Sequence, residues 1–476
     1  MKNVRRWMWC SCALLWAAAV SAAALPNLFN FADSTGTIAT YDTAGAIDTR
    51  NPFFESLGTN GRSCATCHLV DQALSFTPAH AEALFTATRG SDPLFADADG
   101  ANCPGVERSD AAAHSLMLGS GLIRVGLTLP SSPDFTVQTV DDPTGCADVT
   151  DGGGRHLSVY RRPLPSTNLR FLSAVMFDGR ETVAPLNDPN TFAANLVTDL
   201  THQALDATLG HAQAAAPPTA RQLSDIVNFE LTLHTAQHDD HDAGGLNAQG
   251  AAGGPIALAR EAYYPGINDS LGGNPSGAPF QRAAFTIYGP WADLAGNSRD
   301  RYSDAREQIA AGQSIFNTSP LTITGVGGLN DALGQSSIPG TCTTCHDTPN
   351  VGNHSLPVPL DIGVSHVPAF ETDARIRAAL AELSLPGLPA FKVTCGGASP
   401  RTTFTSDPGK ALISGRCADL NRVKGPVLRG LAARAPYFHN GAGATLTEVV
   451  NFYNERFQMH LTPGQKDALV AFLHSL

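Results

Sequence analysis

The sequence predicts a mostly α-helical protein made of two related halves with long irregular loops. Three observations lead to this fold class. A Cys-x-x-Cys-His motif occurs twice, further segments recur in the same order in each half, and glycine and proline make up about one residue in six. Apolar residues at helical spacing close each half, whereas strand signals are sparse. A chain of 476 residues is also too long for one ordinary core, so two domains are expected.

Residues 1–24 have the layout of a secretory signal peptide. Three basic residues precede an apolar run, and small residues follow it up to Ala24. The alternative is a membrane anchor, but the run is short for a bilayer span of about 20 residues. We therefore expect cleavage, export to the periplasm, and no membrane span in the mature chain. Loss of the three basic residues changes the net charge from −12 to −15, and without any basic run the chain is not expected to bind nucleic acid.

Two cysteine motifs predict the cofactor. They consist of Cys64, Cys67 and His68 and of Cys342, Cys345 and His346. In an exported protein this pattern is typical of covalently bound c-type haem, with both thiols on the vinyl groups and the histidine as proximal iron ligand. A redox Cys-x-x-Cys needs no following histidine, and a zinc site would need further ligands at short spacing. We predict two covalently bound c-type haems.

The other four cysteines of the mature chain lack the spacing of a metal site. In an oxidising compartment they are expected to form disulfides. Sequence order suggests the pairs Cys103–Cys146 and Cys395–Cys417, although sequence alone does not prove the connectivity.

Other segments recur between the halves and set the domain organisation. The pairs are residues 167–170 with 426–429, 176–180 with 437–441, and 218–229 with 462–472. Three matches in one order indicate a duplicated cytochrome c-like unit, each closed by an amphipathic helix packed on its haem. The expected parts are an N-terminal haem domain over 25–238 with an irregular insert at about 90–155, a Gly/Pro-rich connection over 239–304, and a C-terminal haem domain over 305–476.

These features together resemble the bacterial diheme cytochrome c peroxidases and their MauG-type relatives. Besides the haem motifs, the resemblance rests on Phe177-Asp178-Gly179-Arg180 and on the segment APYFHNG at 435–441. It covers nearly all of the mature chain except the insert and the connection. It implies that hydrogen peroxide reacts at the haem on His68, while a six-coordinate haem on His346 handles electrons.

The resemblance also implies a proton shuttle near the first haem. The family has a Gln and, ten residues later, a Glu; here Gln203 matches the Gln, but Gln213 stands at the Glu position and cannot exchange a proton. His211 can, because its ordinary pKa is about 6.5. We predict His211 as the distal acid/base and Gln203 as the residue that orients peroxide. A surface histidine is the alternative for His211, and His202 is the next candidate.

The second haem's distal ligand is Met or Tyr in the family. The matching position is Tyr453, with Met459 as the competing ligand and a packed aromatic as the alternative role of Tyr453. A phenolate would stabilise high-valent iron more than a thioether would. The family also binds calcium through backbone carbonyls, which here would lie near Arg434 and Pro436, so one calcium ion is expected.

One position departs from the family pattern. The family usually has an inter-haem Trp before its Asp-Gly-Arg, and this chain has Phe177, which is much harder to oxidise. Trp291, the single tryptophan outside the leader, lies in the connection. Electron transfer between the haems therefore tunnels directly or uses another residue, such as a tyrosine.

The leading hypothesis is a periplasmic diheme peroxidase, reduced by a small donor such as a cytochrome c or a cupredoxin. The acidic charge favours a basic partner. One alternative is a MauG-like oxidase of a protein or organic substrate, which Tyr453 favours and Phe177 weakens. The other is a non-enzymatic diheme electron-transfer cytochrome, against which Gln203 and His211 argue. A homodimer is one expectation for the oligomeric state, which the residues do not decide.

Overall fold

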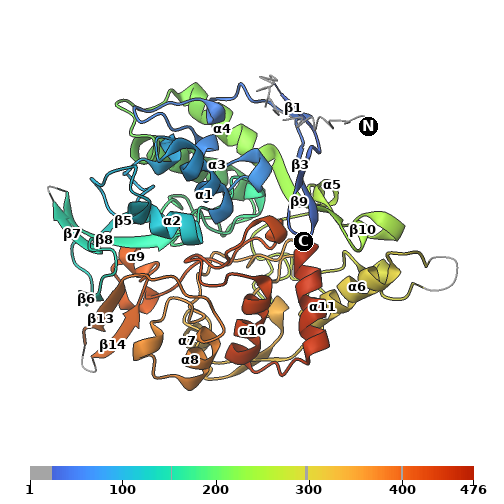
Figure 1. Cartoon of the computed structure of the whole chain (residues 1–476). Helices are drawn as coiled ribbons and strands as arrows, with labels where there is room; N and C mark the ends of the chain where they lie inside the picture. Colours follow the sequence, from blue (N-terminus) through green and yellow to red (C-terminus); the bar gives the residue numbers. More distant parts are fainter. Residues whose placement is uncertain (1–23, 152, 295–298, 398–399) are drawn as a thin grey trace, which may run out of the picture.

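A computed structural model describes residues 24–151, 153–294, 299–397 and 400–476 (Figure 1). The predicted signal peptide, residues 1–24, therefore lies outside the described residues except for Ala24. In Figure 1 the helices of the first half, α1–α4, form the upper body, and those of the second half lie below them. None of the helices in the described ranges is long and apolar enough to cross a membrane.

Helices occur in both haem-motif regions. Those of the first half are α1 (Pro78–Thr88), α2 (Ser115–Ser120), α3 (Phe192–Gly210) and α4 (Ala220–Thr232). The connection contains α5 (Pro255–Leu258). The second half contains α6 (Ser303–Thr318), α7 (Asn330–Leu333), α8 (Ala374–Leu380), α9 (Ala411–Ser414), α10 (Leu446–Phe457) and α11 (Pro463–His474).

The closing helices of the two halves, α4 and α11, begin in the same way. Thr219 and Gln222 form a capping box at α4, and Thr462 and Gln465 form the same box at α11. Each pair satisfies backbone N–H groups that the first helical turn leaves free. The helices expected at the end of each recurring segment are therefore present, with matching starts.

Strands are more abundant than the sequence analysis predicted. The described residues form five antiparallel sheets, in the orders β1-β4, β10-β9-β3-β2, β11-β12, β14-β13-β6 and β5-β8-β7. The strands are β1 (Leu25–Pro26), β2 (Asn30–Ala32), β3 (Gly36–Asp42), β4 (Ala46–Ile47), β5 (Ile123–Thr128), β6 (Phe135–Asp141), β7 (Asp148–Asp151), β8 (Gly154–Arg161), β9 (Leu233–Asp240), β10 (Gly244–Gly245), β11 (Leu321–Ile323), β12 (Ile338–Gly340), β13 (Ala390–Cys395) and β14 (Arg401–Thr405). The mostly α prediction thus holds only in part.

The insert at about 90–155 is not irregular, which corrects the prediction. It contains α2 and the strands β5, β6 and β7, and β6 pairs with β13 of the second half, where Val137 faces Val393. Phe135 and Val137 of β6 are buried and alternate with exposed neighbours. The partner strand lies some 250 residues later, so the strand has little local support in the sequence.

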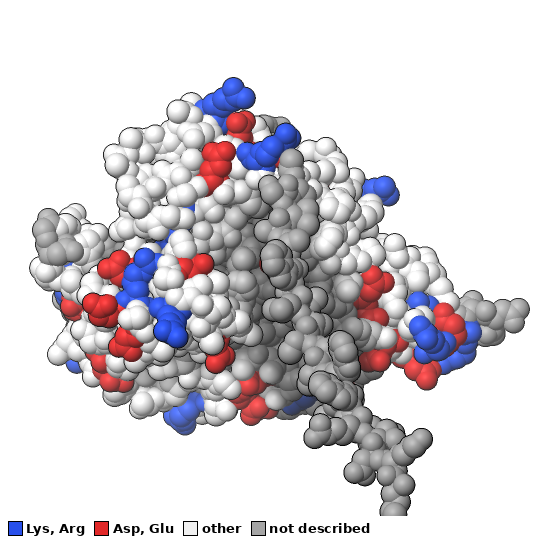
Figure 2. All heavy atoms as spheres, turned by 45° about the horizontal axis from the view of Figure 1, so that its top comes forward, with Lys and Arg blue, Asp and Glu red and all other residues white. Residues whose placement is uncertain are grey.

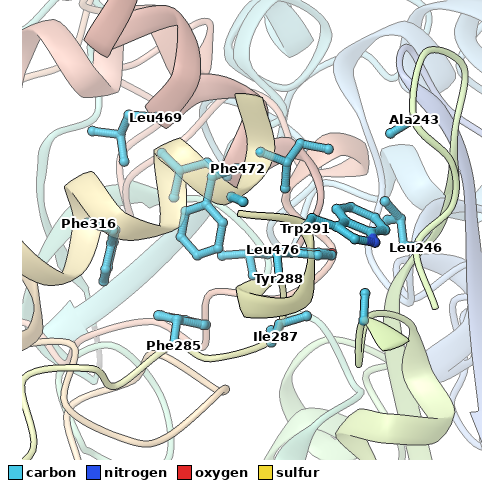
Figure 3. Close-up of a cluster of buried hydrophobic side chains, with 14 of the residues drawn as sticks. Ala243, Leu246, Phe285, Ile287, Tyr288, Trp291, Phe316, Leu469, Phe472 and Leu476 are labelled. Carbon is cyan, nitrogen blue, oxygen red and sulfur yellow. The ribbon is translucent and has the colours of Figure 1, made fainter. Parts of the chain in front are cut away.

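The connection has little regular structure, but part of it is core. Tyr288 and Trp291 are buried, their rings stack at 4.7 Å, and Trp291 Nε1–H donates to the Ala248 carbonyl at 2.9 Å. Figure 3 shows this pair beside Phe472 and Leu476. At its start, the boundary expected between residues 238 and 239 falls inside β9, which pairs with β3. The acidic end of β9 has no strand pattern in the sequence, because it is stabilised by pairing with β3, about 200 residues earlier in the chain.

Both predicted disulfides are present, Cys103–Cys146 and Cys395–Cys417. The second joins the end of β13 to the turn at Cys417–Asp419. Charged side chains do not segregate on the face shown in Figure 2, where acidic and basic groups lie next to each other. The net charge of −12 therefore does not mark a docking patch on that face.

Candidate active site in two adjoining cavities

The two Cys-x-x-Cys-His motifs fold into the same local structure. Each forms a single 3₁₀ turn, Cys64–Thr66 in the first half and Cys342–Thr344 in the second. In both turns the histidine N–H donates to the carbonyl of the first cysteine, and both distances are 3.0 Å. The last residue of each turn, Thr66 or Thr344, forms a capping box with the residue just before the turn, Ser63 or Thr341.

The two motif histidines are held in the same state. His68 Nδ1 lies 3.1 Å from the Leu74 carbonyl, and His346 Nδ1 lies 2.7 Å from the Gly352 carbonyl. A carbonyl only accepts, so Nδ1 carries the proton and Nε2 has a free lone pair. Burial lowers the pKa of each histidine to about 4, so both are neutral at pH 7. This is the state that an iron ligand requires.

The four motif cysteines are free thiols, whereas the other four described cysteines are in disulfides. Burial raises the pKa of Cys67 to about 11 and the pKa of Cys342 and Cys345 to about 12. The Cys64 pKa is raised as well, for the same reason. These thiols are therefore protonated at neutral pH.

Each motif lines its own cavity, and the two cavities adjoin. The first is lined by Cys64, Cys67 and His68, and the second by Cys342, Cys345 and His346. Residues 163–165 and 426–427 line both. The walls are otherwise largely apolar, which suits the porphyrin ring of a haem.

The polar groups of the shared wall also fit haem. Arg434 lines both cavities, and its Nε and Nη2 atoms are buried without a hydrogen-bond partner among the described residues. An unpaired buried cation is costly, and it calls for an anionic partner. Haem has two carboxylates and would supply such a partner. The paired thiols, the neutral histidines and the incompletely paired guanidinium of Arg434 thus all fit a c-type haem.

In the first cavity the structure brings together two residues that the sequence predicted. Gln203, from α3, and His211, which caps the end of α3, both line the cavity that contains His68. The structure thus places both residues at the cavity, and their roles stay predictions.

His211 has a partner that the sequence analysis did not find. Its Nδ1 contacts the carboxylate of Asp99, which lies in the insert, and Asp99 also pairs with Arg62. Burial opposes ionisation of Asp99, but His211 and Arg62 outweigh it and lower the Asp99 pKa to about 2. Asp99 is therefore a carboxylate at neutral pH, and it orients His211 so that Nε2 is the free ring nitrogen.

Arg62 anchors this pair. Its Nε donates to the Pro93 carbonyl at 2.7 Å, and its Nη2 donates to the Leu94 carbonyl at 2.6 Å. The guanidinium thus fixes the loop at the start of the insert and holds the Asp99 carboxylate at the cavity edge. The insert therefore contributes Asp99 to the site. The sequence analysis did not predict this contribution, because it expected the insert to be irregular.

A second buried carboxyl group lines the first cavity. Glu230 of α4 is 4% exposed and lines the cavity, and its Oε2 has no hydrogen-bond partner in the described chain. Burial raises the pKa of Glu230 to about 7, although the Ser166 hydroxyl opposes this shift. The sequence offers no signal for this residue, because it lies on the buried face of an ordinary amphipathic helix.

Gln213 and His202 are not brought to the first cavity. Gln213 lies beyond the end of α3, is exposed, and accepts a hydrogen bond from Asn60 Nδ2 at 3.4 Å. His202 does not line the cavity and pairs with Glu181 at 2.7 Å, and the hydrogen bond to Glu181 raises the His202 pKa. Gln213, which stands at the Glu position of the family, therefore does not line the cavity, since α3 ends at Gly210 before this residue.

The second cavity contains both candidate distal ligands. Tyr453 of α10 and Met459, just after α10, line the cavity with His346. The Tyr453 ring is packed 5.8 Å from Phe457 and 5.6 Å from Phe452. Burial raises the pKa of the Tyr453 phenol. Phenol ionisation therefore requires a strong compensating charge, such as a ferric iron.

Phe177 lies at the edge of the second cavity. Its ring is 5.9 Å from that of His439, and its carbonyl accepts the Lys424 N–H at 2.8 Å. The neighbouring Asp178 binds Arg161 at 2.5 Å, and Arg161 binds Asp407 at 2.6 Å. Asp178 of the Asp-Gly-Arg segment thus belongs to a buried ion network between the halves. Trp291 lines neither cavity.

Comparisons with known proteins give a partial likeness. No family model matches the chain. A cytochrome-c peroxidase IdrP2 from Denitromonas iodatirespirans is 34% identical over 147 residues, which cover 29% of this chain and 36% of that protein. The IdrP2 of Pseudomonas sp. (strain SCT) is 30% identical over 146 residues, which cover 28% and 35%. The chain thus spans about a third of the length of these relatives.

Among solved structures, a MauG-like protein associated with microbial copper homeostasis aligns with 90% of this chain and 87% of its own. The sequence identity is 12% and the TM-score is 0.33. These values are too low to relate the two folds. The likeness to peroxidases therefore rests on the stretch of about 147 residues shared with the two IdrP2 proteins.

Proposed function

We propose that the chain is an exported diheme peroxidase that reduces hydrogen peroxide to water. The observation that carries this proposal is the His211–Asp99 pair, which lines the same cavity as the haem-type motif of His68. An electron-transfer cytochrome needs no acid–base pair beside its iron. The partial likeness to named cytochrome-c peroxidases supports the same function.

The chain's own residues would hold the cofactors and move the proton. Cys64, Cys67 and His68 would hold the first haem, whose iron would supply electrons for cleavage of the peroxide O–O bond. His211 Nε2 would accept a proton from peroxide and return it to the departing oxygen, which leaves as water. Asp99 keeps the other ring nitrogen protonated throughout. Gln203 would orient peroxide in the cavity.

The second cavity would serve as the electron store. Cys342, Cys345 and His346 would hold the second haem, and Tyr453 is proposed as its distal ligand, with Met459 as the alternative. We infer that electrons arrive here from a small donor protein such as a cytochrome c or a cupredoxin. Turnover then consumes one peroxide, two protons and two electrons and yields two water molecules.

Further proposals concern the whole chain. The matching motif turns and the matching starts of α4 and α11 support two duplicated haem domains, over about 25–238 and 305–476. Residues 1–24 are proposed as a cleaved signal peptide, which places the mature protein in the periplasm. A calcium ion is proposed at the carbonyls near Arg434 and Pro436.

Substitution of two histidines, His202 within α3 and His211 at its C-terminal end, tests the proposed function. In the holoenzyme with a chemical donor, His211→Ala should slow peroxide reduction about 10²–10⁴-fold, the usual size of a general acid–base contribution. His202→Ala, which removes a histidine that does not line the cavity, should leave the rate unchanged. The proposal fails if His211→Ala retains the wild-type rate or if His202→Ala loses it.

Tyr453 favours a second candidate function, a MauG-like oxidase of another substrate. Peroxide titration without a donor distinguishes the two. A peroxidase stops after oxidising its own haems and resumes when donor is added. An oxidase instead continues to consume peroxide when its protein or organic substrate is supplied.

A further inference from the structure

We propose that Lys424 and Arg434 form one cationic wall that binds carboxylates of both haems and so raises both of their reduction potentials. The inference rests on the two-haem part of the proposed function, not on peroxide reduction. It concerns a group that the sequence analysis did not assign, since Lys424 belongs to no motif and Arg434 was considered only for its carbonyl.

The two cavities meet at a small set of residues, and two of these carry charge. The residues that line both cavities are Pro163, Leu164, Pro165, Lys424, Pro426, Val427 and Arg434. Five of them have apolar side chains. The charged groups of the shared surface are therefore the ammonium of Lys424 and the guanidinium of Arg434, and both are cations.

Lys424 is held in place but is incompletely paired. It is 6% exposed, and its Nζ donates to the Ala174 carbonyl at 2.9 Å, which uses one of three donors. Its backbone N–H is fixed by the Phe177 carbonyl at 2.8 Å. Burial also lowers the Lys424 pKa to about 7, although the negative charge of Asp178 opposes this shift. A carboxylate in the cavity would supply the missing charge.

Arg434 differs from the other arginines that line these cavities. Arg162 donates to the Gly121 and Phe76 carbonyls at 2.7 and 2.8 Å, and Arg62 is bound by Asp99 and by carbonyls. Arg434 has two buried guanidinium nitrogens without a partner in the described chain. Its donors are therefore available for a cofactor carboxylate, whereas those of Arg62 and Arg162 are already used.

The wall has an electrostatic consequence for both irons. A fixed cation favours the reduced state of a nearby iron, because reduction lowers the positive charge at the cofactor. In a buried region of low effective dielectric this influence extends further than in water. Since Lys424 and Arg434 touch both cavities, loss of either charge should lower both reduction potentials.

Spectroelectrochemical titration of the holoprotein tests this, with the two haems followed by their separate absorption bands and no peroxide present. Lys424→Gln and Arg434→Gln should each shift both midpoint potentials to more negative values. The control Lys392→Gln, which removes a cation of β13 that lines neither cavity, should shift neither. A shift confined to one haem, or no shift, would overturn the shared wall.

Two further measurements keep the result interpretable. Arg434→Lys preserves the charge and should keep both potentials closer to the wild-type values than Arg434→Gln does; an equal shift in both variants counts against the proposal. Haem content is measured in every variant. A wild-type protein with fewer than two covalent haems would refute the proposed function itself, whereas normal haem content with unshifted potentials would refute only the wall.

Discussion

The two cavities have the same motif turn and the same histidine geometry but different walls. Asp99, Glu230 and Glu55 line the first cavity, whereas no Asp or Glu among the described residues lines the second. Carboxyl groups can transfer protons directly or orient a histidine that does so. Under the proposed function, the motif would hold the cofactor, and the surrounding residues would decide whether a cavity performs proton chemistry.

The largest effect is expected when the charge of Asp99 is removed, because this carboxylate distinguishes the first cavity from the second. Asp99→Asn should slow peroxide reduction about 10²-fold or more, because an amide can leave His211 with the proton on the wrong nitrogen. Stopped-flow mixing of the holoenzyme with peroxide measures the rate, and its pH profile should change as well.

Combining variants separates orientation from other effects of Asp99. If Asp99 acts through His211, Asp99→Asn combined with His211→Ala should be no slower than His211→Ala alone. Losses that multiply would contradict this role. Glu55→Gln, which alters another carboxyl group of the same cavity, serves as the matched control and should have a much smaller effect.

His366 forms a charge cluster with Asp361 and Glu371 in the second half of the chain, and this cluster should make the stability of that half depend on pH. His366 Nε2 lies 3.1 Å from Asp361, and its Nδ1 contacts Glu371. Burial opposes protonation of His366, but the two carboxylates outweigh it and raise its pKa to about 10. The unfolded value is about 6.5. The stabilisation is therefore complete below about pH 6.5 and is lost as the pH rises through about 10.

Thermal unfolding of His366→Gln tests this dependence. The variant should melt below the wild type near pH 6, and the difference in Tm should shrink steadily as the pH approaches 10. An exposed histidine gives the control, since His241→Gln should show no such trend. A difference that stays constant over this range would show that His366 contributes through packing alone.

The smallest expected effect concerns the distal ligand. Tyr453→Phe should change the absorption spectrum of the second haem and leave the first haem unchanged, because Tyr453 lines only the second cavity. Met459→Leu should have no effect on either spectrum. The reverse outcome, a change only in Met459→Leu, would assign the ligand to Met459.

Local covalent patterns made part of the site predictable. The haem motifs need only five consecutive residues each, and their turns formed as the spacing required. Gln203 and His211 were placed by a resemblance over one helix, and the structure brings both to the first cavity. Both disulfides followed from chain order.

Long-range partners explain what the sequence did not reveal. Asp99 lies 112 residues before His211, inside a segment expected to be irregular. Strand β6 has its partner in another half of the chain, and Gly/Asp-rich turns around it obscure the alternation of buried and exposed residues. Lys424 belongs to no sequence motif. Its proposed role depends on its position where the two cavities adjoin, which only the three-dimensional structure shows.

The pairing of β6 with β13 has a consequence for how the molecule acquires its structure. Synthesis delivers residues 135–141 long before residues 390–395, so β6 must wait for its partner with an open edge. Such an edge is prone to pair with other chains. A protein shortened before β13 lacks the partner strand of β6, so we expect it to aggregate more than the full chain although its own haem motif is complete.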